Sequence, residues 1–300
     1  MERRTQLRYG RSMGSSNKSA AKPVGDLLRQ WRVHRRKSQL EFAGDAEIST
    51  KHLSFLETGR SRPSRDMVLR LSELLEVPLR ERNALLAAAG FAPVFPERKL
   101  DDPALVLARQ AIDTVLQGHE PYPALAVDRH WNLVASNQMA GAFMRGVDES
   151  LLTSPPNVLR VSLHPKGLAP RIANLIEWRT HLLERLRHQV DVSADPQLEA
   201  LYRELSSFPL PERDASGMTP AQAVIPRHEY ESMVVPFKLM TPHGLMSFFS
   251  TTTVFGTAVD VTLAELAIEA FFPADAETAK MLQEIAAKRA ESPQPLGARR

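Results

Sequence analysis

The sequence predicts two domains, an all-α bundle of five short helices followed by an α+β domain with an antiparallel sheet. The chain has 300 residues, about twice the roughly 150 residues of an average domain. Residues 23–90 carry apolar side chains at helical spacing between capping residues. Residues 124–136 and 234–272 contain short extended stretches joined by turns, which is typical of hairpins.

The composition is that of a soluble globular protein, with 43% hydrophobic and 24% charged residues. The chain has no Cys, which excludes disulfides and cysteine metal sites and fits the reducing cytoplasm, where we expect the protein. No apolar run approaches the roughly 20 residues that span a bilayer. Residues 1–20 are basic and lack the apolar segment of a secretory signal. We therefore expect no membrane partner.

Charge is distributed unevenly along the chain. Residues 1–65 hold 15 Lys and Arg against 6 Asp and Glu, a net charge of +9. The other 235 residues hold 23 against 29, a net charge of −6. A basic segment on a mildly acidic body favours a polyanionic partner such as nucleic acid, although a solvated charged surface would have the same counts.

Capping residues and apolar stripes alternate through the first domain. Val24, Leu28 and Trp31 lie on one face of the first helix. Ser64 can cap the fourth helix, and Gly90 can end the fifth. Each helix would bury one stripe, so the five would form a small bundle. The helices are expected at residues 23–35, 38–46, 49–58, 64–77 and 79–89.

The third of these helices has two chemically different faces. Ser49 is a good N-cap, and Gly59 suits the left-handed residue that stops a helix. Leu53 and Leu56 are three residues apart and face one way. The DNA major groove accepts a helix and presents hydrogen-bond donors, acceptors and thymine methyls. The face of the helix opposite the leucines would match these groups, although any short amphipathic helix has two such faces. That opposite face carries Thr50, Lys51, Ser54 and Phe55.

This helix and the one before it share residues with a known family. These residues are Ser38, Gln39, Ala43, Ile48, Ser49, Leu53, Leu56, Glu57 and Gly59. They resemble the helix-turn-helix of the Cro/repressor type, often called the XRE family, which implies a five-helix lambda-repressor-like domain. The turn usually carries Gly, and this chain has Glu47 there. If the backbone is left-handed at that point, a non-glycine residue costs of order 1 kcal/mol.

The spacing of polar residues in this motif predicts how it would contact DNA. Thr50 and Lys51 lie in the first turn, where a docked helix meets base edges. Phe55, on the same side, could contact a thymine methyl, and the alternative is a place in the bundle core. The remaining polar residues could contact bases or, in the flanking segments, phosphates. The predicted DNA contacts are Gln39, Ser49, Thr50, Lys51, His52, Ser54, Phe55, Arg60 and Arg62.

The second domain, residues 104–289, is expected to be an α+β domain with helices inserted between its second and third strands. Strands are predicted at residues 124–127, 131–136, 234–240, 245–254 and 265–272. Helices are predicted at residues 104–117, 137–145, 170–190, 196–206 and 275–289. Residues 1–22 and 290–300 are expected to be disordered tails, and the Pro-containing residues 91–103 a linker.

Five motifs spread over residues 23–289 are similar to those of the MmyB-like transcriptional regulators. The motifs are Ser49–Phe55, Pro78–Asn83, Val127–Trp131, Leu163–Pro165 and Phe271–Asp275. The resemblance implies a helix-turn-helix joined to a PAS-like ligand-binding domain, for which a fatty-acid-type ligand is the expected class.

Large apolar residues on the predicted strands could form either a plain core or a pocket with a few polar anchors. Arg171 could pair with a ligand carboxylate, because its planar fork matches that group. An ordinary surface salt bridge is the alternative for Arg171. The candidate ligand-binding residues are His164, Arg171, Asn174 and Trp178.

Catalytic chemistry has little support in the sequence. His181, Glu184 and His188 share one predicted helix but lack the i, i+4 histidine pair of zinc helices. No Gly-rich phosphate loop or nucleophile elbow is present. We therefore predict no catalytic residue, no metal site, no cofactor and no enzymatic activity.

Together these observations predict a cytoplasmic, ligand-responsive transcriptional regulator. It would bind double-stranded operator DNA through residues 23–90 and a small apolar molecule through residues 104–289. A single helix-turn-helix makes few base contacts, so a homodimer is expected. Two alternatives remain: the second domain serves only for dimerisation or protein contacts, or it is an enzyme tethered to an operator-binding domain.

Overall fold

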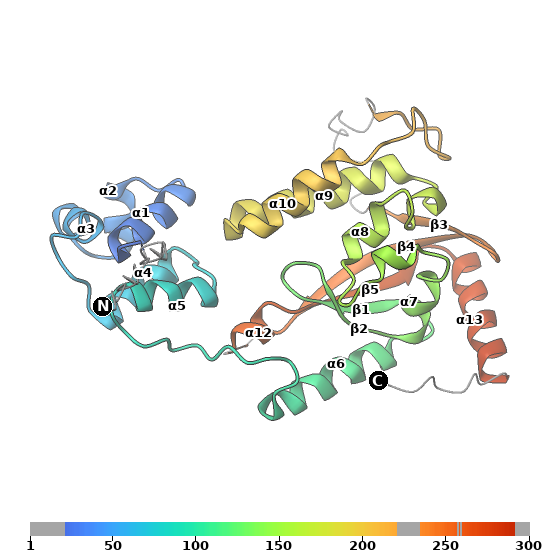
Figure 1. Ribbon diagram of the computed structural model, residues 1–300, viewed down its shortest axis with the longest axis horizontal. Coiled ribbons are helices and arrows are strands. Elements are labelled where there is room, and N and C mark those ends of the chain that lie inside the picture. The colour runs from blue at the N-terminus through green and yellow to red at the C-terminus, as the bar shows by residue number, and fades with distance from the viewer. Residues whose placement is uncertain (1–21, 221–234, 257, 259, 292–300) are drawn as a thin grey trace, which may run out of the picture. The chain divides into compact units, whose positions relative to one another are not determined.

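The computed structural model describes most of the chain (Figure 1). The described residues are 22–220, 235–256, 258 and 260–291. The predicted disordered tails lie outside them, except that residue 22 is described and residues 290–291 belong to the last helix.

The chain forms two compact units. Among the described residues, 22–77 and 81–93 make the first, and residues 78–80 and those from 94 onward make the second. The five helices predicted near the N-terminus are all present (Figure 1). They are α1(Val24–His34), α2(Gln39–Asp45), α3(Thr50–Glu57), α4(Arg65–Leu74) and α5(Leu79–Ala88).

Serine hydroxyls begin three of these helices, as predicted from the sequence. The Ser38 hydroxyl accepts a bond from the Glu41 N–H, and the Glu41 carboxylate accepts one from the Ser38 N–H, which makes a capping box. Ser49 and Ser64 accept bonds from backbone N–H groups in the first turns of α3 and α4. Each cap stabilises its helix by about 1 kcal/mol. Glu47, the unusual turn residue, does have a left-handed backbone with φ 52°.

The core of the first unit draws apolar residues from all five helices. Leu28, Leu53 and Leu71 are fully buried in it. Helices α1 and α3 approach so closely that a Cβ added at Gly25 would lie 2.4 Å from the Leu56 carbonyl oxygen. Only glycine fits at this position without moving α3 away from α1.

The second unit contains a five-stranded antiparallel sheet in the order β2-β1-β5-β4-β3. The fold class is therefore the predicted one, an antiparallel α+β domain after a five-helix bundle. In the register of the sheet, Glu269 lies opposite Leu125 on one side and Thr252 on the other. The strands are β1(Ala124–Val127), β2(Leu133–Ser136), β3(Phe237–Thr241), β4(Gly244–Val254) and β5(Ala267–Pro273).

Helices cover both faces of this sheet (Figure 1). Helix α6(Val106–Gly118) packs on one face through Ile112 and Leu116. The larger core lies on the other face, beneath α7(Gln138–Phe143), α8(Val158–Leu163), α9(Leu175–Ser193) and α10(Pro196–Ser207). Further helices among the described residues are α12(Val261–Ala264), α13(Ala276–Glu291) and the short 3-10 turns η1(Pro103–Leu105), η2(Glu149–Leu151) and η3(Ala169–Arg171).

The start of one helix and the presence of two others differ from the sequence prediction. Helix α9 begins at Leu175 instead of residue 170, because Ile172 forms a β-bridge with Leu239 and cannot be helical at the same time. Helices α8 and α12 were not predicted. Both are short, with six and four residues, and therefore have too few turns to show a helical period.

Candidate DNA-binding surface and ligand pocket

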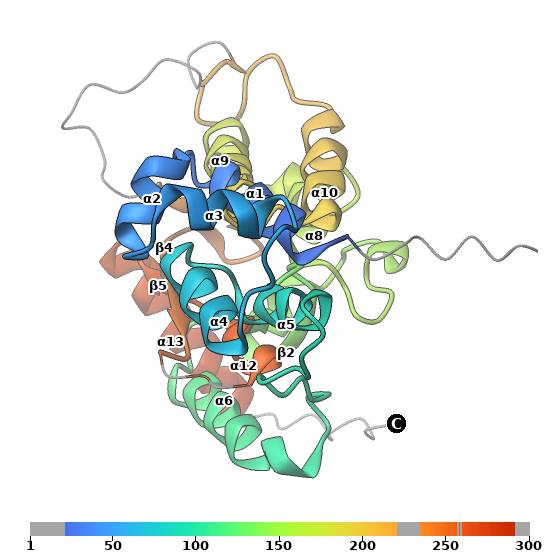
Figure 2. The same cartoon turned by 90° about the vertical axis from the view of Figure 1, so that its left-hand side faces the viewer.

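Helix α3 is held to the bundle by one face and leaves the other open (Figure 2). Leu53 and Leu56 are at most 1% exposed. Ser49, Thr50 and Lys51 are exposed, and His52, Ser54 and Phe55 are half-buried. The polar side chains predicted to face DNA thus lie on the accessible side of this helix.

Phe55 lies between two cations on this open face. The Lys51 ammonium is 5.7 Å and the Arg60 guanidinium 5.8 Å from the centre of its ring. Phe55 is not part of the buried cluster that forms the core of the bundle. Cation–π contacts of this kind hold the two charges near the ring, so the surface combines apolar area with positive charge. Arg62, in the following loop, is also exposed.

A buried polar network fixes the end of α3. The Glu57 carboxylate, 4% exposed, accepts bonds from Arg32 at 2.6 and 3.0 Å. The Gln39 side-chain amide donates to the same carboxylate at 2.7 Å. The hydrogen bond with Glu57 raises the pKa of Arg32, although burial acts in the opposite direction. Residues from α1, α2 and α3 are thereby joined, and the Gln39 amide, predicted to contact phosphate, is used in part by this network.

A pocket of about 100 Å³ lies within the second unit, between the sheet and helices α7, α8 and α9. Most of its wall is apolar. Of the two possibilities for the large apolar residues of the strands, a plain core or a pocket, some of them line a pocket. Four aromatic rings are packed in series: Trp178 lies 4.9 Å from Phe237, which lies 5.8 Å from Phe271 and 6.2 Å from Phe248, measured between ring centres. The wall also includes Leu125, Phe143, Leu159 and Leu182.

The lining of the pocket includes an ion pair. Arg185 of α9 donates to both carboxylate oxygens of Glu269 of β5, at 2.6 and 3.0 Å. Thr252 lies beside the pair, 2.7 Å from Arg185 and 3.0 Å from Glu269. The Arg185 guanidinium is 4.7 Å from the centre of the Trp131 ring. Neither charged residue was predicted as part of a site.

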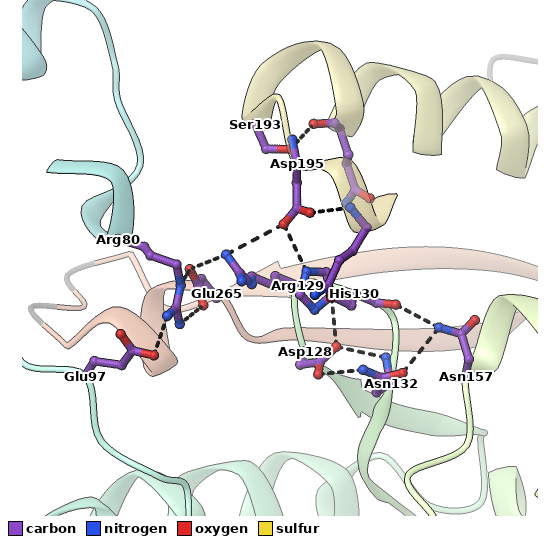
Figure 3. Close-up of polar contacts among 12 residues, drawn as sticks. Arg80, Glu97, Asp128, Arg129, His130, Asn132, Asn157, Ser193, Asp195 and Glu265 are labelled. Atoms are coloured by element: carbon purple, nitrogen blue, oxygen red, sulfur yellow. Dashed lines mark hydrogen bonds and ion pairs between the residues drawn. The ribbon is translucent and has the colours of Figure 1, made fainter. Parts of the chain in front are cut away.

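The turn between β1 and β2 carries Trp131, whose side chain lines the pocket. Figure 3 shows the polar contacts of its neighbours in this turn. The Asp128 carboxylate accepts bonds from the backbone N–H groups of His130 and Asn132. Asn157 donates to the His130 carbonyl at 2.7 Å. These bonds stabilise the left-handed backbone of Trp131, φ 67°, which few non-glycine residues adopt.

The same turn is joined to the start of α10 (Figure 3). The His130 Nε2 atom is 2.9 Å from the Asp195 carboxylate, and Arg129 is 3.7 Å from it. Burial alone would raise the pKa of Asp195. The hydrogen bonds from His130 and the Gln197 N–H, together with the nearby charges, outweigh it, so the pKa lies below its ordinary value.

Of the four predicted ligand anchors, Trp178 lines the pocket, and its indole N–H donates to Ser162 at 3.2 Å. The other three lie outside the lining. His164 accepts a bond from the Lys166 N–H, and Asn174 is fully buried and bonds to the chain around Pro236. Arg171 donates to the carbonyl of Met240 and to two carbonyls near the end of α7. Its pairing with a ligand carboxylate stays a prediction.

His181, Glu184 and His188 of α9, which the sequence does not predict to be a metal site, do not converge. His181 is half-buried and 5.6 Å from the Trp178 ring, whereas Glu184 and His188 are exposed. Burial, and then the charge of Arg185, lower the pKa of His181, so its ring is neutral near pH 7. The part of the chain that the structure describes contains no group of three or more His, Asp or Glu that could hold a metal ion. None of the described helices combines the length and apolarity needed to cross a membrane.

Comparison with known families now decides what the two units are. Residues 108–285, more than half of the chain, match the family described as "MmyB-like transcription regulator ligand binding domain". The chain belongs to the MmyB-like transcription regulators. Residues 23–85 of this MmyB-like protein match the family described as "Helix-turn-helix domain". The chain is therefore a transcription regulator that joins a helix-turn-helix to a ligand-binding domain, and both families are regulatory rather than enzymatic.

Other comparisons add little to this assignment. No curated protein matches the MmyB-like chain. A solved structure, "Structure of an RNA-binding Light-Oxygen-Voltage Receptor", is similar at 11% sequence identity with a TM-score of 0.22. The match covers 89% of this chain and 64% of that chain, so the MmyB-like chain spans less than two thirds of that structure. A likeness this weak carries no argument about fold or function.

Proposed function

We propose that this MmyB-like regulator binds a specific operator through α3 and that occupation of the pocket in the second unit changes its operator affinity. One observation carries the proposal. The same chain contains a helix with an open polar face held by buried leucines and, elsewhere, an apolar pocket closed by a few polar groups. The first feature suits a major-groove reader and the second suits a small-molecule site.

On the DNA side, Thr50 and Lys51 contact base edges in this proposal, and Phe55 contacts a thymine methyl. Ser49, His52 and Ser54 contact bases or phosphates nearby. Arg60 and Arg62, together with Gln39, contact the phosphate backbone and so position the helix without reading sequence. The protein acts as a homodimer on a near-palindromic site, since half-sites about one helical turn apart match paired helix-turn-helix units.

On the ligand side, a small apolar molecule occupies the pocket. The family resemblance adds a fatty-acid-type molecule as the first class to consider. The ligand acts by binding more tightly to one of two states, one competent for DNA and one not, and so shifts the population between them. A ligand that changes operator affinity must itself be bound more tightly or more weakly in the presence of operator, by the same factor.

Two measurements on the full chain test this function. The operator is selected from random-sequence duplexes, and the number of protomers on it is determined by analytical ultracentrifugation. Small molecules released from the purified, denatured protein are identified by mass spectrometry, and their effect on operator binding is measured. A monomer bound to a site without repeats would refute the dimer. A protein that releases nothing and ignores every pocket-binding molecule would favour a pure dimerisation domain, and turnover of a small molecule would favour an enzyme.

A further inference from the structure

The two charges in the pocket are already neutralised by each other. Among the described residues that line it, Arg185 and Glu269 are the only two with charged side chains. Both carboxylate oxygens of Glu269 are paired with the guanidinium, at 2.6 and 3.0 Å. The Glu269 side chain is 5% exposed and that of Arg185 24% exposed. A two-point pair of this kind is among the strongest that a carboxylate forms.

Neighbouring residues hold the guanidinium in this arrangement. The Thr252 hydroxyl bridges the pair, within 2.7 Å of Arg185 and 3.0 Å of Glu269. The Trp131 ring lies against the guanidinium. The fork of Arg185 is therefore directed at Glu269 and not at the empty part of the pocket.

This arrangement disfavours a charged ligand. A ligand carboxylate would have to share Arg185 with Glu269, which places two like charges in one partly buried site. The other route is to displace Glu269, which would leave a buried carboxylate without its partner. A ligand cation would meet the same difficulty with Arg185. An uncharged ligand avoids both, and the hydroxyls of Ser162 and Ser250 in the wall can bond to a neutral carbonyl or amide.

The size and lining of the pocket restrict the ligand further. Its volume is about 100 Å³, of the same order as the roughly 150 Å³ engineered cavity that binds benzene. Trp178, Phe237, Phe248 and Phe271 surround this space with ring centres about 5–6.5 Å apart. These distances show that the rings pack against one another. Where their faces and edges line the space, they offer edge-on or offset contacts to a further aromatic ring.

We propose that this pocket takes an uncharged aromatic molecule of about one ring, and that Glu269 is the residue that excludes carboxylates. The proposal rests on the proposed function, because it takes the pocket to be the ligand site. It keeps the pocket as the ligand site and replaces the fatty-acid-type class with a ligand whose polar group is neutral.

Calorimetry on the full chain at pH 7 tests the proposal with benzamide and benzoate, which match in size and differ in charge. Benzamide is expected to bind at least about tenfold more tightly than benzoate. In Glu269→Gln, Arg185 loses its counter-charge, so the affinity for benzoate should rise about tenfold and approach the affinity for benzamide. Glu184→Gln removes the same charge from the exposed side of α9 and should leave the ratio unchanged. A thermal melt checks that each variant is folded, and the wild-type ratio decides the question even if Glu269→Gln does not fold.

The outcomes separate this inference from the proposed function. Benzoate binding as tightly as benzamide to the wild type would overturn the inference and leave the ligand pocket in place. Decanoate serves as a third probe, for the acyl-chain class that the family resemblance implies. If decanoate binds and neither ring compound does, the inference is wrong and the proposed function stands. If none of the three binds at millimolar concentration, the inference is wrong, and the mass spectrometry of released molecules decides the proposed function.

Discussion

Replacement of Glu57 tests whether the buried polar network holds the recognition helix α3 in place. Glu57→Ala would remove the bonds at 2.6 and 3.0 Å to Arg32, which is itself 8% exposed. Arg32 would then keep its bond to the Lys37 carbonyl but would be a buried cation without a counter-charge. Loss of one partner of a buried pair lowers the free energy of unfolding by about 3–5 kcal/mol.

A matched control comes from the same unit. Lys37 pairs with Asp45, and their side chains are 34% and 45% exposed. Lys37→Ala should therefore lower the free energy of unfolding by at most about 1 kcal/mol. The measurement is urea denaturation of the full chain, followed by hydrogen exchange of peptides from residues 24–57. The double variant Arg32→Met/Glu57→Leu should recover most of the stability, because apolar replacement of both charges leaves neither unpaired. If Glu57→Ala costs no more than Lys37→Ala, the network does not hold α3.

Three further predictions concern the first unit. Lys51→Ala should weaken operator binding by about 1–3 kcal/mol and relax the preference for one base pair. Arg62→Ala should weaken binding to operator and random DNA alike, and should lower the slope of log affinity against log salt concentration by about one. Fluorescence anisotropy measures both effects. Phe55→Ala should lower operator affinity with little change in melting temperature; a loss of about 3–5 kcal/mol of stability would instead assign the ring to the core. Gly25→Ala should reduce stability and operator affinity together, because the added Cβ meets the α3 backbone. Gly44→Ala, with nothing within 4 Å of the added atom, should reduce neither.

The first unit could be predicted in detail because its signals are local. Ser38, Ser49 and Ser64 each act on an N–H only three residues away, so the helix starts are encoded in short stretches of sequence. The spacing of Leu53 and Leu56 fixes which face of α3 is buried. The left-handed residue at Glu47 could be anticipated from the turn position alone.

The pocket could be predicted only in kind. Arg185 and Glu269 are 84 residues apart, on α9 and β5, and nothing near either residue in the sequence indicates the other. Their pairing depends on the register that sets Glu269 opposite Thr252 and on how α9 crosses the sheet. Arg171 was the cation predicted as an anchor, but its side chain donates to backbone carbonyls, next to the β-bridge of Ile172. Long-range packing therefore decided which cation lines the pocket.

Control of DNA binding by the pocket can be measured in one titration. The full chain is titrated onto its selected operator, by fluorescence anisotropy, with and without a saturating amount of the molecule that calorimetry or mass spectrometry identifies in the pocket. Coupling between the pocket and DNA binding predicts that the dissociation constant changes by about 5- to 150-fold, and that operator changes the affinity for that molecule by the same factor. Equal dissociation constants with the pocket filled and empty would contradict it.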